Sequence, residues 1–412
     1  MKRHVAMTLA PSALLVAIHA APALAESDAE LKQQVRALTE RLEKLEDRGQ
    51  VNLPAGTTLT FGGYTKLDLI YDFDQGQGDT TFAPGLEIGA PSDGGFDAHV
   101  RQTRLNFKTE TQTERGPLTT FFEMDFFGSR GDERQTNSHR PRLRHAYGQW
   151  NGWTAGQTWT TFMPIEAYPA TVDFQGPSGI PFIRQAQLRY TFPAGKGLDV
   201  SVAIENPEFS GRADGVTGNI GESTGPLADV NADFDQTPDL VLAAKWQQDD
   251  SLLRGAVVLR NLEAPSTLGG DDDLGWGLNI AGGTPLWAGG RIVGSFTYGD
   301  GVGRYIIDGA GQDAFIDSTG RLNTIEAYGA TAQVTHAFTD KVTGGLAYGF
   351  YSVEDTFAPS DTDQVQTVHA SVFYKPVDRL TLGAEVSWGE RELASGASED
   401  ATRLQTSVQF SF

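Results

Sequence analysis

The last nine residues of the chain alternate between two kinds of side chain. The even-numbered residues are apolar or threonine, namely Leu404, Thr406, Val408, Phe410 and Phe412. The odd-numbered residues between them are Gln or Ser. Because successive side chains of a strand point to opposite faces, this segment predicts a strand with one apolar and one polar face. Strands of this kind are typical of a transmembrane β-barrel, where lipid covers one face and water the other. The last strand of a soluble β-sandwich is the alternative interpretation.

About sixteen segments with this alternation follow one another between residues 59 and 412. In the first, Phe61–Tyr71, the pattern places Leu67 and Leu69 outward and Lys66 and Asp68 inward. The connections alternate between short turns, such as Asn151-Gly152, and long loops, which fits a barrel with tight turns at one end only. We therefore predict an all-β fold, an antiparallel transmembrane barrel of about sixteen strands over residues 59–412.

The N-terminus carries the three parts of an export signal. Lys2 and Arg3 precede an apolar stretch at 5–18, and Ala23-Leu24-Ala25 is a small-residue cleavage site. We predict a signal peptide at 1–25, although a soluble periplasmic protein would carry one too. No later segment has about 18 consecutive apolar residues, so no membrane-spanning helix is expected. The chain has no Cys, which excludes disulfides and thiolate chemistry.

Residues 26–49 predict a short helix with one apolar stripe. The stripe follows a heptad spacing: Leu31, Val35, Leu38, Leu42 and Leu45. A helix this short needs a partner, which favours a coiled coil that helps an oligomer to assemble, whereas docking on its own barrel or disorder is the alternative. Two heptads are too few to fix the number of strands in the coil. Residues 50–58, which include Pro54, are interpreted as a linker.

A barrel of this size is too wide for side chains to fill, so it predicts a water channel. Strand alternation places basic side chains inward on several strands: Arg104, Lys108, Arg142, Arg144, Arg189, Arg254 and Arg260. Arg184 flanks the end of its strand, where the alternation does not fix its direction, and we include it in the same ladder. Arginine keeps its charge and its planar fork suits carboxylates, so the ladder favours small anions. The alternative is a nearly neutral pore, in which Glu123, Asp125 and loop acids pair with these arginines.

The long loop 163–182 is the candidate constriction. Four prolines and the stretch Gly176-Pro177-Ser178-Gly179 indicate a stiff, compact loop. We expect four of its residues to shape the pore: Glu166, Asp173, Phe174 and Pro177. The alternative is a loop that only covers the mouth of the barrel.

Enzymatic and nucleic-acid functions find little support in the sequence. No Gly-x-Ser-x-Gly elbow, HExxH or EF-hand spacing occurs, so we predict no catalytic residues, no metal and no cofactor. Strand parity places His145 and His336 outward and His369 inward. A net charge of −21 argues against nucleic acid as a partner. Acidic loops such as 271–273 could bridge cations and lipopolysaccharide, but solvated loop tips are the simpler interpretation.

Several motifs in the first half of the barrel resemble those of the DcaP-like outer-membrane porins. They are Gly62–Asp68, Arg101–Phe107, Glu123–Gly128, Arg142–Gly148, Ala155–Trp159 and Arg184–Tyr190. The resemblance implies a homotrimer of sixteen-stranded barrels with an N-terminal coiled coil, and passive uptake of small anions such as dicarboxylic acids. In general porins the loop after the fifth strand bends into the pore, and by position this is loop 163–182. The terminal Phe412 resembles the signature that the barrel-assembly machinery reads.

The sequence therefore predicts a porin of the Gram-negative outer membrane. Its expected partners are the lipid bilayer, lipopolysaccharide, small anionic solutes and further copies of itself. A secreted or surface-exposed β-rich adhesin or carbohydrate-binding protein is the alternative. That alternative explains the aromatic residues and acidic loops, but not the one-sided strands.

Overall fold

The computed structural model describes residues 54, 56–77, 82–128, 136–208, 210–214, 236–309 and 312–412. The predicted signal peptide, the coiled-coil helix and most of the linker lie outside these residues. The first strand begins at Thr57, two residues before the predicted start of the barrel.

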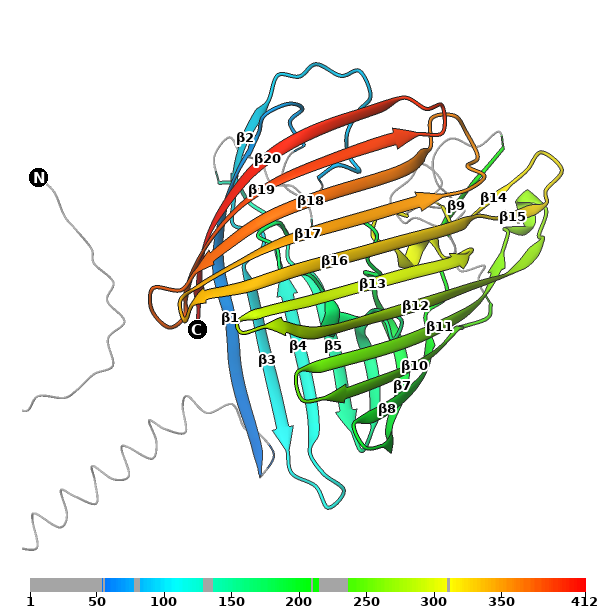
Figure 1. The fold of residues 1–412 in the computed structure, drawn as a ribbon. Helices are drawn as coiled ribbons and strands as arrows, with labels where there is room; N and C mark the ends of the chain where they lie inside the picture. The colour runs from blue at the N-terminus through cyan, green and yellow to red at the C-terminus, as the bar shows by residue number, and fades with distance from the viewer. Residues whose placement is uncertain are drawn as a thin grey trace, which may run out of the picture. The chain divides into compact units, whose positions relative to one another are not determined.

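Sixteen antiparallel strands form a closed wall, because β1 pairs with β20 as well as with β3 (Figure 1). The wall strands are β1 (Thr57–Asp72), β3 (Arg104–Thr111), β4 (Leu118–Asp125), β5 (Arg142–Trp150), β6 (Trp153–Trp159), β7 (Arg184–Gly195), β8 (Leu198–Glu205), β10 (Asp239–Gln248), β11 (Ser251–Glu263), β12 (Asp272–Trp287), β13 (Gly290–Asp300), β16 (Glu326–Thr339), β17 (Val342–Val353), β18 (Thr362–Tyr374), β19 (Leu380–Leu393) and β20 (Ser398–Ser411). Each predicted segment corresponds to one of them, so the barrel prediction is confirmed.

Shorter elements complete the fold. The strand β2 (Gly95–His99) pairs with the end of β1 that β3 does not reach. A separate sheet joins β9 (Gly211–Ala213), β14 (Ala314–Ile316) and β15 (Leu322–Thr324). The 3-10 helices are η1 (Ile165–Ala167), η2 (Ser266–Leu268) and η3 (Gly303–Tyr305). No helix among the described residues is long and apolar enough to cross a membrane.

The wall strands divide their side chains as the alternation predicts. On β1, Leu67 and Leu69 are exposed on the outside, whereas Lys66 and Asp68 are buried inside. On β20, the outward Phe410 is exposed and the inward Gln405 is buried. An apolar exterior suits lipid, and a polar interior suits water.

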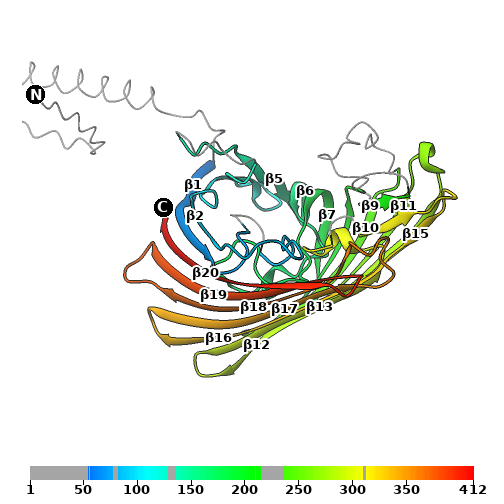
Figure 2. The same ribbon diagram turned by 90° about the horizontal axis from the view of Figure 1, so that it is seen from above.

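The interior is only partly open, because three segments between strands fold inward (Figure 2). Phe82 and Leu86 lie between β1 and β2, Phe162 follows β6, and Tyr305 belongs to η3; all four are buried in one apolar cluster. Their partners on the wall are mostly small, such as Ala327 and Ala401. This packing contacts the wall on β8, β10 and β11 and again on β16, β17, β18 and β20.

Candidate functional site

Residues 160–183, called the constriction loop below, connect β6 to β7 and cross the lumen. On the far wall, Glu385 of β19 accepts hydrogen bonds from the backbone N–H groups of Val172 at 2.7 Å and Asp173 at 3.2 Å. The side chain of Gln333 on β16 pairs with both backbone groups of Ala170, at 2.8 and 2.7 Å. The prediction that this loop bends into the pore is therefore consistent with its path in the structure.

Glycines let the loop backbone lie directly on the wall. Gly179 has a φ of +80°, which an L side chain rarely adopts. Side chains at Gly329 of β16 or Gly349 of β17 would collide with the loop backbone at 178–179. The loop therefore docks by close backbone approach as well as by hydrogen bonds to side chains.

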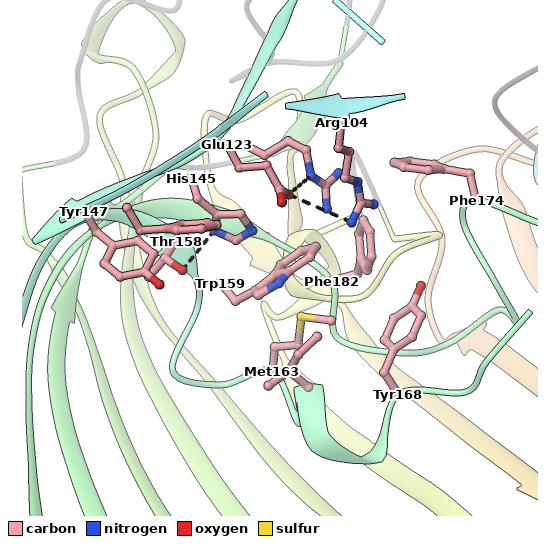
Figure 3. Close-up of a pocket in the computed structure, with 13 residues that line it drawn as sticks. Arg104, Glu123, His145, Tyr147, Thr158, Trp159, Met163, Tyr168, Phe174 and Phe182 are labelled. Carbon is pink, nitrogen blue, oxygen red and sulfur yellow. Dashed lines mark hydrogen bonds and ion pairs between the residues drawn. The ribbon is translucent and has the colours of Figure 1, made fainter. Parts of the chain in front are cut away.

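A cavity of about 440 Å³ remains between the constriction loop and the β3–β6 wall (Figure 3). The wall contributes Arg104, Glu123 and Arg144, together with aromatic side chains. The loop contributes Met163 and further aromatic residues. We call it the aromatic cavity below. The aromatic residues that line it are Phe121, Tyr147, Trp159, Tyr168, Phe174 and Phe182.

A β-bulge on β5 sets the direction of two residues in this cavity. Glu123 pairs with His145 and Met124 with Leu143, so Arg144 is the extra residue between them. His145 therefore points inward, where its Nδ1 lies 3.0 Å from the hydroxyl of Thr158. The prediction that His145 faces outward is wrong, because a bulge shifts the alternation by one residue.

Carboxylates compensate several of the predicted ladder arginines. Arg142 forms two hydrogen bonds with Asp125, and Arg144 bonds Glu123 at 2.7 Å and Asp125 at 3.0 Å. Arg104 makes only a 3.9 Å contact with Glu123. The alternative interpretation, in which acidic residues pair with the arginines, therefore holds for Arg142 and Arg144.

Arg184 and Arg189 differ from these, because no carboxylate of the described residues forms an ion pair with either. The guanidinium of Arg184 lies over the ring of Trp159, with its carbon 4.6 Å from the ring centre. One buried nitrogen of each, Nη1 of Arg184 and Nε of Arg189, lacks a hydrogen-bond partner within the described part of the chain. The positive charge of these two side chains is therefore not neutralised by an ion pair within the described residues.

A second cavity of about 300 Å³ adjoins the first along the β6–β11 wall. It is lined by Arg189, Lys245 and Arg254, and by Glu166 of the constriction loop, which pairs with Lys245 at 3.3 Å. Arg254 donates hydrogen bonds to the carbonyls of Thr161 and Phe162, so its guanidinium holds the loop.

The remaining predicted residues lie away from the open path. Arg260 is 1% exposed and pairs with Asp239 at 3.2 Å and Asp313 at 3.0 Å, so it is a buried structural cation rather than a pore-lining one. Lys108 pairs with Glu110 at 3.0 Å on an exposed part of β3.

Within the constriction loop, only some of the four predicted residues face the pore. Phe174 lines the aromatic cavity and Glu166 the second one. Asp173 is buried and accepts two backbone hydrogen bonds, each 2.8 Å long, from Gln175 and Gly176. Pro177 lies against Gly349 of the wall. Both of these residues shape the loop from its wall side.

Sequence reasoning missed the aromatic side of the site. Trp159 and Phe182 flank the loop and their ring centres are 4.7 Å apart. The available signal was a tryptophan at a strand end directly before a proline-rich loop. Strand alternation does not predict the direction of side chains in the loop beyond the end of a strand.

A closed sixteen-stranded barrel with an apolar exterior and a constricted, charged lumen defines a porin-type channel. The model of the DcaP outer membrane protein family matches residues 50–412. The chain therefore belongs to the DcaP family of outer-membrane proteins, and its location is the outer membrane. No curated protein sequence matches the chain.

Solved structures with a similar barrel include the outer membrane channel DcaP of Acinetobacter baumannii. It is 22% identical, with a TM-score of 0.75 over 87% of this chain and 99% of that one. OmpT of Vibrio cholerae is 12% identical, with a TM-score of 0.54 over 88% and 100%. The anion-selective porin of Comamonas acidovorans is 11% identical, with a TM-score of 0.54 over 86% and 100%. At these identities the likeness concerns the fold.

Proposed function

We propose that this channel passes small solutes by diffusion and prefers anions, including dicarboxylates. The observation that carries the proposal is the charge around the constriction. Seven basic side chains face four carboxylates around the two cavities: Arg104, Arg142, Arg144, Arg184, Arg189, Lys245 and Arg254 against Glu123, Asp125, Glu166 and Asp199. The excess positive charge in a narrow, water-filled passage lowers the energy of an anion and raises that of a cation.

The dicarboxylate preference rests on two further arguments. The family resemblance implies it, and basic side chains line both neighbouring cavities, Arg104 and Arg144 the aromatic cavity and Arg189 and Lys245 the second. The cavities share Thr158, Trp159, Met163 and Ile165 in their linings, so they are direct neighbours in the lumen.

Planar-bilayer recording under a potassium chloride gradient tests the anion preference. We expect an anion-selective reversal potential for the wild type, and a shift toward cations when Arg184 and Arg189 are both changed to Gln. Arg115→Gln, in an exposed turn, is the matched control and should leave the potential unchanged. A cation-selective wild type, or an unchanged potential in the double variant, contradicts the proposal.

We also propose a homotrimer, with residues 26–49 as its coiled coil. A structure of Vibrio cholerae OmpT in a trimer form shares this fold, which supports the proposal. Deleting residues 26–49 should reduce the trimer band of unheated protein in detergent gels while the heat-modifiable monomer band remains. An unchanged trimer band after this deletion would contradict the role of residues 26–49 and show that the barrel surface alone holds the trimer together.

Assembly through Phe412 and contact with lipopolysaccharide remain proposals. Phe412 follows the last strand, its ring is exposed, and its N–H bonds the carbonyl of Gly63. Its deletion should lower the yield of folded barrel in the membrane without changing the conductance of the barrels that do form. A closed barrel with an apolar exterior disfavours the adhesin alternative.

A further inference from the structure

The aromatic cavity combines charged side chains with a large apolar lining. Six aromatic side chains, Met163 and Ile165 line it beside a few charged groups. Ile165 is 44% exposed although it points into the lumen. Apolar surface in contact with water is unfavourable, so its presence at a constriction points to a ligand with an apolar part.

The rings are held in place rather than left free. Trp159 contacts both Phe182, at 4.7 Å, and His145, at 5.6 Å between ring centres. Tyr168 lies 5.8 Å from Phe182 and donates a hydrogen bond to the carbonyl of Gln175. Burial raises the pKa of Tyr168, so its hydroxyl stays protonated. A rigid aromatic wall loses little conformational entropy when a flat molecule packs against it.

Cations lie at the same wall. Arg184 stacks on Trp159, and Arg144 lies 5.9 Å from the centre of the same ring. Glu123 and Asp125 pair with Arg144, whereas Arg104, which lines the cavity, makes only a 3.9 Å contact with Glu123. A carboxylate bonded to Arg104 therefore leaves the rest of its molecule against the aromatic rings.

We propose that the aromatic cavity is a subsite for carboxylates that carry a flat aromatic ring. The carboxylate contacts Arg104, and the ring packs against Trp159, Phe174 and Phe182. The inference rests on the proposed anion channel and specifies which anions are held there longest.

The test is the effect of benzoate, compared with propionate as a non-aromatic carboxylate, on single-channel current. We expect benzoate to produce current interruptions at concentrations about threefold to tenfold lower than propionate does, which is the advantage expected from one aromatic contact. Trp159→Leu and Phe182→Leu, made separately, should remove this difference. Trp246→Leu, on the outward face of β10, is the matched control and should retain it.

Equal effects of benzoate and propionate on the wild type would overturn the inference, as would a benzoate preference that survives in both cavity variants. The potassium chloride reversal potential separates this result from the proposed function. Anion selectivity without a benzoate preference contradicts only the proposed aromatic subsite. Cation selectivity with a benzoate preference contradicts only the proposed anion channel. Heat-modifiable gel mobility shows whether each variant has folded.

Discussion

Arg142 and Asp125 lie opposite each other on β5 and β4 and are joined by two hydrogen bonds. The Nε–Oδ1 distance is 3.0 Å and the Nη2–Oδ2 distance is 2.8 Å. Asp125 also accepts from Arg144, which bonds Glu123 as well, so these two carboxylates compensate Arg142 and Arg144. Arg184 and Arg189 are then the ladder arginines that no carboxylate of the described residues pairs.

Asp125→Asn should therefore increase anion preference. Removing one negative charge about 10 Å from a passing ion in water changes its energy by roughly 0.4 kcal/mol, or about a factor of two in local concentration. The reversal potential under a salt gradient measures the change. Asp249→Asn, in an exposed turn, is the control. A shift toward cations in Asp125→Asn would show that the freed arginines no longer face the pore.

Arg260→Met should destabilise the barrel. Arg260 is the shared partner of Asp239 and Asp313, and all three side chains are nearly inaccessible to water. Removing the cation leaves two buried carboxylates without their counter-ion, a loss of about 3–5 kcal/mol. The temperature at which unheated gel mobility changes should fall in this variant and stay the same in Arg115→Met, where the arginine is exposed. An unchanged transition would mean that the network adds no net stability.

Gly349→Ala should loosen the constriction loop. Its Cβ would collide with the loop backbone at Ser178 and with Pro177, so the loop must move away from β17. We expect altered conductance and more current noise in bilayer recordings. Gly255→Ala, whose Cβ would have its nearest neighbour at 4.0 Å, is the matched control. If Gly349→Ala conducts like the wild type, docking on this wall does not set the pore size.

The contact between Asp308 and the constriction loop should depend on pH. Asp308 lies between β13 and β16 and accepts hydrogen bonds of 3.2 Å from Gly179 and Gln175 of the loop. Burial raises the pKa of Asp308 from 3.8 to about 6. Its contribution to stability is therefore complete below pH 3.8 and is lost as the pH rises through about 6.

Thermal transitions of the wild type and Asp308→Asn from pH 4 to 8 measure this dependence. The wild type should lose stability relative to Asp308→Asn as the pH rises through 6. Asp317→Asn is the control, because hydrogen bonds lower the pKa of Asp317 to about 2, outside this range. A constant difference between wild type and Asp308→Asn would show that Asp308 does not titrate there.

The predicted wall strands and the observed ones correspond closely for a physical reason. Each residue of a wall strand faces either lipid or water, and its own polarity indicates which. The faces of Leu67, Asp68 and Leu69 can therefore be predicted without knowing which strands are neighbours. The constriction loop could be predicted similarly, since its prolines restrict φ and its glycines permit the positive φ of tight turns, both of which are local effects.

The partners of the charged residues could not be predicted in this way. Arg142 and Arg189 are both arginines that strand alternation places in the lumen. Arg142 forms an ion pair with Asp125, whereas no carboxylate of the described residues pairs with Arg189. The difference depends on which strands are neighbours and on their register, which the sequence does not state. The inward packing of Phe82 and Tyr305 escaped prediction for the same reason, because long loops have many possible paths.

By itself the sequence determined that this chain closes a barrel with an apolar outside and a polar inside, since alternation is a local property of each strand. Only the tertiary structure decided which arginines remain uncompensated, that a bulge turns His145 into the lumen, and that aromatic side chains gather beside Arg104 and Arg184. These features arise where residues distant in the chain meet, and the free energy of those contacts depends on geometry that no single segment encodes.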